Sequence, residues 1–408
     1  MLRYGEQSVP RLGVPHVKIR YMLLHAYGTG GTIRTVIDQA NAMAAAGHDV
    51  ELVSVVRRRD APQFAPDPGV TLTTLVDERG GRRPDSVARR VWRRMRGKVV
   101  PKGEFAAGYF TERVERATMR YVSGLRDGIL VTTRPALNLI SARRAPASVI
   151  RVAQEHMNLS AYPVTIRREI ARHYGRFDAV TVLTRGNRAE YERLLPGTPI
   201  VHIPNAVPRT RGTRSQQVNP VVVAAGRLVP QKGFDLLIKA FAQVVAEHPE
   251  WRLRVFGTGP RRGELAGLVQ RHGLGRNVSL PGRTRRLEQE MAGASVYALS
   301  SRFEGLPMVM IEAMAHALPV VAFDCPTGPG DVLTDGVDGV LVPPGDVDGL
   351  AAALNRVIAD RELRMRLGAA AAETAKLYAA ERVMPLWEQL FIDMSRDRRV
   401  WRDLWHSG

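Results

Sequence analysis

Apolar and polar positions alternate along the chain in two successive series of short apolar runs, glycine-rich turns and amphipathic stretches. In the first series, an apolar run at 17–24 precedes the turn Gly28-Thr29-Gly30-Gly31. Helical spacing over 32–46 then ends at Gly47. Further strands are predicted at 49–56, 129–133, 148–153, 178–183 and 199–203. This alternation predicts a parallel sheet with helices on both faces.

The second series begins at Pro220. Its predicted strands lie at 221–225, 252–256, 278–280, 296–299, 319–323 and 339–342, with helices at 234–247 and 347–359. The polar stretch 209–219 lacks periodicity and is predicted to be a linker. The last stretch, 385–405, is helical and carries three tryptophans, so we expect it to cross back and dock on the first domain.

The predicted fold is therefore α/β, with two doubly wound domains facing across a cleft. The expected parts are a flexible tail (1–16), an N-terminal domain (17–208), the linker (209–219), a C-terminal domain (220–384) and the returning helix (385–408). Ligands of such sheets bind at the carboxyl ends of the strands, so loops of both domains should line the cleft.

Composition restricts the compartment and the class of protein. Cys325 is the single cysteine among 408 residues, which excludes an internal disulfide and favours a reducing compartment. No apolar run reaches the length of a membrane span, and 1–16 does not resemble a signal peptide, so we expect a cytoplasmic protein. Aromatic residues make up 6%, which argues against single-stranded nucleic-acid binding by base stacking.

The net charge of +19 is unevenly divided, with +16 on residues 1–210 and +3 on 211–408. This division predicts an acidic partner for the first half: a nucleic acid, an anionic membrane or an anionic substrate. The alternative is an arginine-rich proteome.

The basic residues concentrate between Arg79 and Lys102, where ten of them accompany the single acid Asp85. A basic amphipathic helix with a tryptophan is typical of an interfacial anchor. The rivals are capture of an anionic polymer and a solvated loop. The predicted membrane or polymer contacts are Arg89, Arg90, Trp92, Arg93, Arg94 and Arg96.

Two carboxylates, Glu304 and Glu312, have seven residues between them and flank a predicted helix start at Pro307. Backbone amides around 305–308 would point into the cleft and favour an anion. Glu312 has apolar helical neighbours, so it needs a bonded partner, for which ribose hydroxyls are suitable. The alternative is a carboxylate that reaches solvent or pairs with an arginine.

A second loop, Gly226 to Gly233, follows a predicted strand and carries Arg227 and Lys232. Two cations beside glycines at the carboxyl edge of a sheet suit a diphosphate. The alternative is two solvated loop cations.

Three weaker signals lie in the first half. Gly30 and Gly31, with Arg34 nearby, allow close approach of a phosphate or sugar, although their spacing is not a dinucleotide fingerprint. His156, after the strand at 148–153, could bind a sugar hydroxyl, and Asn205 is a further candidate contact. A structural histidine and a plain turn residue are the alternatives.

The pair Asp346 and Asp348 has a spacing used for divalent metals elsewhere. Here the pair opens the helix at 347–359, so helix capping is the favoured interpretation.

Taken in order, these segments resemble a retaining glycosyltransferase of family 4 with the GT-B fold. The resemblance extends from about residue 17 to the C-terminal helix, and its most specific part is the Glu304-x7-Glu312 motif. A segment from Cys325 to Asp331 resembles a C-P-x-G-P-x-E variant of bacterial members that use UDP-sugars on cell-envelope glycans, with Asp331 in place of the usual glutamate.

The resemblance implies roles for the motif residues. His156, Glu304, Arg227 and Lys232 would be catalytic, with the two cations on the donor diphosphate. The implied donor-binding set is Gly30, Gly31, Arg227, Lys232, Glu304, Gly305, Leu306 and Glu312. Arg34 and Asn205 would contact acceptor or sugar.

The implied activity is retaining, metal-independent transfer of a hexose or N-acetylhexosamine, without a cofactor, from a UDP-sugar. The acceptor would be a lipid-linked glycan or an anionic wall polymer at the inner membrane surface. Alternatives are a sugar-nucleotide epimerase of the same fold and a basic nucleic-acid-binding protein, for which no binding motif is found.

Overall fold

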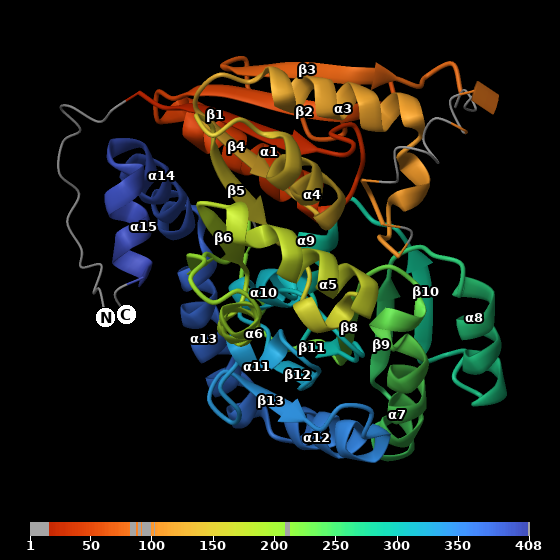
Figure 1. The fold of residues 1–408 in the computed structure, drawn as a ribbon. Helices are drawn as coiled ribbons and strands as arrows, with labels where there is room; N and C mark the ends of the chain where they lie inside the picture. Colours follow the sequence, from red (N-terminus) through yellow and green to blue (C-terminus); the bar gives the residue numbers. More distant parts are fainter. Residues whose placement is uncertain are drawn as a thin grey trace.

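Two parallel sheets form the centres of two α/β domains (Figure 1). The computed structural model describes residues 16–81, 87, 88, 91, 99–101, 103–208 and 213–406. Within them, the N-terminal sheet has the order β3-β2-β1-β4-β5-β6-β7 and the C-terminal sheet β10-β9-β8-β11-β12-β13. Figure 1 shows the N-terminal domain above the C-terminal one. The predicted fold class of two doubly wound domains is confirmed.

The strands of the two sheets are short and mostly buried. The N-terminal strands are β1 (Lys18–Leu23), β2 (Asp49–Arg57), β3 (Val70–Asp77), β4 (Ile129–Thr132), β5 (Ile150–Gln154), β6 (Ala179–Val182) and β7 (Ile200–His202). The C-terminal strands are β8 (Val221–Ala225), β9 (Arg252–Phe256), β10 (Val278–Gly282), β11 (Val296–Leu299), β12 (Val320–Phe323) and β13 (Gly339–Val342).

Helices cover both faces of each sheet. The N-terminal domain has α1 (Gly31–Ala45), α3 (Glu112–Gly124), α4 (Pro135–Arg144), α5 (Val164–His173) and α6 (Arg185–Leu194). The C-terminal domain has α7 (Phe234–Glu247), α8 (Arg262–Arg271), α9 (Leu287–Ala292), α10 (Met308–Ala315), α11 (Pro329–Val332), α12 (Val347–Ala359) and α13 (Arg361–Ala375). The last two helices are α14 (Ala380–Arg396) and α15 (Arg398–His406).

The returning helices α14 and α15 pack on the N-terminal domain, beside β1 and α1 (Figure 1). Trp387 and Phe391 of α14 join the core beneath β1, where Phe391 lies edge-on to Tyr21 with ring centroids 6.3 Å apart. Arg398 of α15 donates to the buried carboxylate of Asp178 at 2.6 Å. Helices that follow the C-terminal domain in the sequence thus complete the core of the N-terminal domain.

The segment predicted as a linker is packed over its described part. Ser215 and Gln217 are buried, and the Gln217 amide donates to the carbonyl of Ala317 at 2.7 Å. Residues 213–219 therefore belong to the surface of the C-terminal domain, because side-chain hydrogen bonds hold them where the sequence offers no hydrophobic periodicity.

No helix among the described residues is long and apolar enough to cross a membrane. The predicted contact residues Arg89, Arg90, Trp92, Arg93, Arg94 and Arg96 lie outside the described residues, so the basic-helix hypothesis stays a prediction.

Candidate functional site

The strand orders set the place of the site. The strand order of each sheet reverses beside its first strand. The reversal lies between β1 and β4 in one domain and between β8 and β11 in the other. Crevices at such reversals, outside the carboxyl ends of the strands, are the usual ligand sites of these sheets. The loops after β1, β4 and β5 therefore meet the loops after β8, β11 and β12.

On the C-terminal side, the two strongest sequence motifs meet in one ion pair. Lys232 Nζ lies 2.6 Å from Glu304 Oε1, and the Ser301 hydroxyl donates to the same oxygen at 2.5 Å. The Glu304 side chain is only 6% exposed, so this carboxylate depends on its two partners. A cation and a carboxylate 72 positions apart in sequence are thus brought together at the crevice.

Glycines make this meeting of loops possible. Gly233 follows Lys232 with φ +60, and a Cβ there would lie 1.9 Å from the carbonyl oxygen of Ser300. Only glycine fits a position with that conformation and that neighbour. Arg227 extends from the end of β8 as an exposed side chain, with its nearest described partner the Gln231 amide oxygen at 3.5 Å.

Glu312 lies on α10 with no hydrogen bond or ion pair among the described residues. Burial raises the pKa of its carboxyl, and the charge of Arg34 in the other domain opposes that shift. Arg34 itself lies 3.8 Å from Asp38 and above the ring of Phe64. Glu312 is thus a half-buried carboxylate without a partner among the described residues, and its binding of ribose hydroxyls stays a prediction.

The predicted start of α10 at Pro307, with free backbone amides around it, is wrong. The helix begins at Met308, with Pro307 as its N-cap. The Met308 amide donates to the carbonyl of Leu306 at 2.8 Å and is therefore taken up inside the turn. The Leu306 side chain is buried in the core, so any contact it makes with a donor would come from its backbone.

The two halves of the crevice touch through the loop after β5. A Cβ on Gly305 would lie 2.7 Å from the carbonyl oxygen of His156, so the backbones approach as only a glycine allows. The buried amide of Asn158 donates to the carbonyl of Glu304 and lies 3.3 Å from those of Pro326 and Thr327. We call these contacts the Asn158–Gly305 contact.

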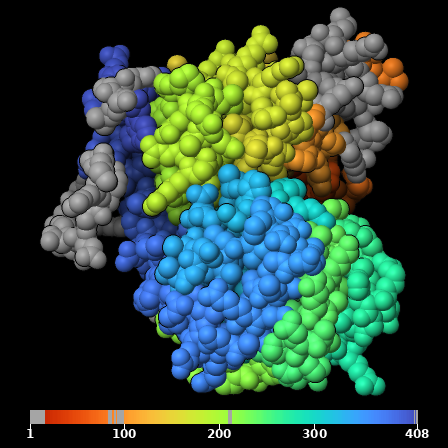
Figure 2. All heavy atoms as spheres, turned by 90° about the horizontal axis from the view of Figure 1, so that it is seen from below, coloured from red at the N-terminus to blue at the C-terminus, as the bar shows by residue number. Residues whose placement is uncertain are grey.

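A second contact joins the domains beside the first. Asp331, from the segment resembling C-P-x-G-P-x-E, accepts from the Gly186 amide at the start of α6, at 3.2 Å. Figure 2 shows the C-terminal domain in front of this part of the N-terminal domain. Asp331 thus acts on the other domain's helix, in a favourable position for an acid. Cys325, at the head of the same segment, is buried.

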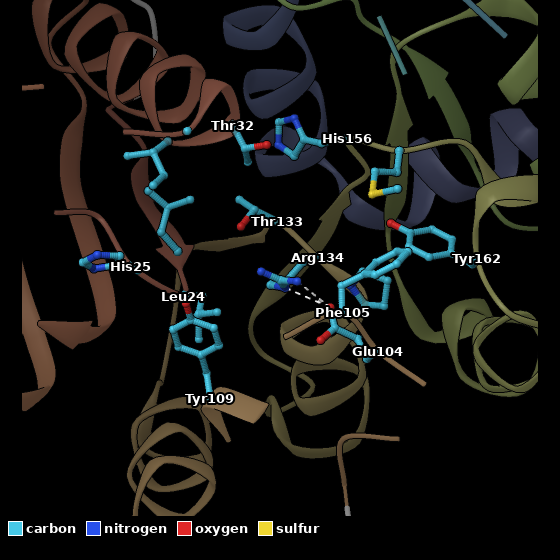
Figure 3. A pocket seen from close by; sticks show the side chains of 15 residues that line it. Leu24, His25, Thr32, Glu104, Phe105, Tyr109, Thr133, Arg134, His156 and Tyr162 are labelled. Atoms are coloured by element: carbon cyan, nitrogen blue, oxygen red, sulfur yellow. Dashed lines mark hydrogen bonds and ion pairs between the residues drawn. The ribbon is translucent and has the colours of Figure 1, made fainter. Parts of the chain in front are cut away.

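A cavity of about 330 Å³ opens in the N-terminal domain at the reversal between β1 and β4. Its wall includes Gly30, Thr133 and Arg134 from the loops after β1 and β4, and His156 after β5 (Figure 3). Arg134 points into it and is held by Glu104, with Nη2 to Oε1 at 2.7 Å. We call this space the N-terminal cavity.

His156 enters the N-terminal cavity as a neutral ring. Both of its ring nitrogens are buried and have no hydrogen-bond partner among the described residues. Burial first, and then the charge of Arg134, lower its pKa to about 4. A neutral imidazole offers one donor and one acceptor, which a sugar hydroxyl could satisfy.

The remaining predicted residues are dispersed. Gly30 is the N-cap of α1 and Gly31 its first residue, both exposed at the crevice, with open space around Gly31. Asn205 follows β7 and is buried, and its amide oxygen lacks a partner among the described residues. Among the described residues, no hydrogen bond or ion pair joins these three to Lys232 or Glu304.

Arg134 and Glu104 were not among the residues predicted from the sequence. Arg134 lies on a strand-to-helix loop, directly before Pro135 at the start of α4. Arg227 was predicted as a site residue from the same kind of position, so this position could also have indicated Arg134. Glu104 lies in a segment without periodicity, and nothing in the sequence connects it to Arg134.

Helix capping explains the Asp346 and Asp348 spacing, as predicted. The Asp346 carboxylate accepts from the Gly349 amide at 2.9 Å, and Asp348 accepts from Gln243 at 2.7 Å. Among the described residues, no group of three or more histidine, cysteine or acidic side chains is placed to hold a metal ion.

Known proteins resemble this chain both in part and over their whole length. The family model described as "Glycosyl transferases group 1" matches residues 211–374, which include both the Arg227–Lys232 loop and the Glu304–Glu312 motif. An exopolysaccharide phosphotransferase of Streptomyces coelicolor is 35% identical over 390 residues, 93% of this chain. The chain spans 41% of that relative's length.

Two further similarities cover whole proteins. An uncharacterised glycosyltransferase of Haemophilus influenzae is 24% identical over 381 residues, covering 91% of this chain and 99% of the relative. A crystal structure of a TarM mutant from S. aureus, in complex with fondaparinux, alpha-GlcNAc-glycerol and UDP, gives a TM-score of 0.74. It covers 92% of this chain and 100% of its own at 16% identity, a likeness that shows the fold alone.

The structural likeness shows the GT-B fold, and the family match lies largely in the C-terminal domain.

Proposed function

We propose that this protein is a retaining glycosyltransferase that moves a hexose or N-acetylhexosamine from a UDP-sugar to a glycan or polymer of the cell envelope. The observation that carries the proposal is the Lys232–Glu304 pair. It lies beside Gly305, whose backbone meets that of His156, and His156 lines the N-terminal cavity with no partner for its ring among the described residues. The named exopolysaccharide role of one relative and the UDP complex of a structural neighbour support the substrate classes.

In the proposed reaction, Arg227 and Lys232 bind the donor diphosphate, and Glu312 binds the ribose. The bond between the anomeric carbon and the phosphate oxygen breaks as an acceptor hydroxyl oxygen attacks from the same face. The hydroxyl proton passes to the departing phosphate oxygen, and the configuration is retained. Fixed cations stabilise the leaving charge in place of a metal ion.

Glu304 has two parts in this proposal. It holds Lys232 through one N–H in the structure, and the ammonium has two further N–H groups for the donor diphosphate. The other oxygen of Glu304 would accept from a hydroxyl of the donor sugar. One ring nitrogen of His156 would contact that sugar from the N-terminal side, which leaves the other nitrogen for the acceptor. The cavity beside His156 favours transfer over epimerisation, since an epimerase has no use for an acceptor site.

The acceptor is proposed to be a lipid-linked glycan or an anionic wall polymer, met at the inner face of the plasma membrane. The charge of +16 on residues 1–210 supports an anionic surface or polymer as the partner.

The test begins with thermal shift against a panel of nucleotide sugars, followed by donor hydrolysis and transfer with and without EDTA. We expect stabilisation by UDP-sugars and turnover that EDTA does not reduce. Lys232→Ala and Glu304→Ala should each lower kcat/KM about 10²- to 10³-fold, because each removes a charge at the reacting diphosphate or sugar. Lys239→Ala, at an exposed position of α7, is the matched control. Full turnover in both site variants would refute the site assignment.

A further inference from the structure

The N-terminal cavity is small and closed on several sides by side chains. Its volume of about 330 Å³ is near the lower end of the range of about 300–1,000 Å³ found for ligand pockets. Such a volume suits one ring of an acceptor rather than several. The groups on its wall can therefore be compared with those of a single acceptor unit, either a sugar ring or a phosphate-bearing unit.

Charge on this wall is already balanced. Arg134 donates from Nε at 3.0 Å and from Nη2 at 2.7 Å to the same oxygen of Glu104. The Glu104 side chain is 1% exposed, and its other oxygen accepts from the Ala106 amide at 2.5 Å. The guanidinium charge is thus balanced by a buried carboxylate whose two oxygens are both hydrogen-bonded.

Neighbouring groups add no free cation to the wall among the described residues that line it. Burial lowers the pKa of His25 as well as that of His156, so both rings are neutral near neutral pH. Arg58, the cation nearest Tyr109, stacks on that ring at 4.3 Å and is paired with Glu78 at 2.6 Å. Arg59 adds to the shift at His25 without lining the cavity.

Aromatic rings form much of the remaining wall (Figure 3). Phe105 is 62% exposed and Tyr109 is 37% exposed, although both are large apolar side chains. Tyr162 is fixed because its hydroxyl donates at 2.7 Å to the buried carboxylate of Glu155. Ring faces pack well against the apolar C–H face of a sugar, which a phosphodiester does not offer.

Unpaired polar atoms complete the wall. Both ring nitrogens of His156, and Nδ1 of His25, are buried without a partner among the described residues. Neutral imidazoles pair with hydroxyl groups, each of which can donate and accept. Buried polar atoms without partners are rare in folded proteins, so these point to a ligand with several hydroxyls.

We propose that the N-terminal cavity binds an uncharged sugar ring of the acceptor and discriminates against a phosphate-bearing unit, with the Arg134–Glu104 pair as the determinant. The inference rests on the proposed function and decides between its two acceptor classes. A phosphate would bring a second negative charge to a guanidinium whose charge Glu104 already balances, which is unfavourable at a partly buried site. A hydroxyl can instead accept from the remaining guanidinium N–H groups without breaking the pair.

The test measures binding directly, by ligand-observed NMR titration of the full chain. The probes are neutral trisaccharides (gluco, galacto, manno and N-acetylhexosamine) and trimers of glycerol phosphate and ribitol phosphate. We expect at least one neutral trisaccharide to bind ten-fold or more tightly than both phosphate trimers. Glu104→Gln frees the guanidinium, so it should narrow or reverse that preference.

Glu169→Gln is the matched control, because Glu169 pairs with Arg143 in the same domain away from the cavity. It should leave the preference unchanged, and thermal melts show whether each variant is folded. Tighter binding of a phosphate trimer by the wild type, failure of every neutral sugar to bind, or equal effects of Glu104→Gln on both classes would each overturn the inference. Donor hydrolysis without acceptor reports separately on the proposed function.

Discussion

His156 shows how burial determines the chemistry of one side chain. Its ring lies at the end of β5 with both nitrogens enclosed, so protonation would place an unpaired charge beside Arg134. The ring therefore remains neutral over the range in which free histidine titrates. Neutrality is what a group needs if it is to contact a sugar hydroxyl without attracting an anion.

This burial predicts a pH dependence of stability. With the pKa of His156 lowered from 6.5 to about 4, the unfolded chain binds a proton between those values that the folded protein does not. The free energy of unfolding should thus fall as pH falls through this window, by up to about 1.4 kcal/mol per pH unit from this group. Urea unfolding of His156→Gln between pH 4.5 and 7 should show a shallower dependence than the wild type.

The comparison must isolate His156, since burial also lowers the pKa of His25, His173 and His202. Those groups act in the same direction in both proteins and cancel in the difference. His272→Gln, at an exposed position, is the control and should keep the wild-type slope. An unchanged slope in His156→Gln would contradict the assignment.

At the residue scale, the groups on glycine-flanked loops after strands could be predicted from the sequence. Lys232 and Glu304 belong to such loops, and the structure places them 2.6 Å apart. That they pair with each other, and that Glu104 holds Arg134, could not be predicted. Those pairs depend on how loops distant in sequence pack, and no local pattern records that.

At the scale of elements, the loop after β5 reaches across to the loops after β11 and β12. Asn158 bonds to Glu304 and lies near two carbonyls of the Cys325–Asp331 segment, while the His156 backbone lies against Gly305. One loop therefore fixes the distance between the cavity and the donor-side carboxylate. The geometry of transfer should depend on the Asn158–Gly305 contact.

Gly305→Ala tests that dependence. A Cβ 2.7 Å from the carbonyl oxygen of His156 requires the two loops to separate. We expect kcat for transfer to fall at least about ten-fold, because small misplacements of reacting groups are costly. Affinity for UDP should change much less, since Arg227 and Lys232 are untouched.

Gly263→Ala provides the control, because a Cβ there, on α8, meets no atom within 4 Å. Steady-state kinetics and UDP titration of both variants make the comparison. Equal loss of UDP affinity and of kcat in Gly305→Ala would indicate general damage rather than misplacement.

Most elements were predictable because their apolar periodicity is strong. β9, β11, β13, α7 and α12 have the predicted bounds. β3 was missed because its half-exposed threonines, at the edge of the sheet, dilute the apolar pattern. The helix at 385–405 begins earlier, at Ala380, passes through Pro385 and breaks at Asp397, which the tryptophan spacing alone does not indicate.

At the scale of the whole molecule, the N-terminal domain is built from two distant parts of the chain. Its core includes Val17, directly before β1, and Ile19 of β1 together with Trp387, Phe391 and Trp401 from the last two helices. The indole of Trp401 also donates to the Asp178 backbone at 2.9 Å. Burial of these rings ties the stability of the first sheet to the end of the chain.

Trp387→Ala should therefore destabilise the N-terminal domain strongly. The side chain is 1% exposed and lies 5.6 Å from Phe391 between ring centroids, so its loss leaves a large cavity. We expect the free energy of unfolding to fall by about 3–5 kcal/mol. Chemical denaturation measures the change, with Val400→Ala, 53% exposed on α15, expected within about 0.5 kcal/mol of wild type. Comparable losses in the two variants would contradict this role for α14.

The crossing of α14 and α15 also has a consequence for synthesis on the ribosome. The first strand, β1, emerges early, but the rings of Trp387, Phe391 and Trp401 that close its core follow only after the whole C-terminal domain. The C-terminal domain, whose sheet and helices are contiguous from β8 to α13, can complete its own core first. The domain that is synthesised first is thus the one that completes its core last. Until α14 and α15 leave the exit tunnel, the nascent N-terminal domain exposes an apolar face to which chaperones would bind.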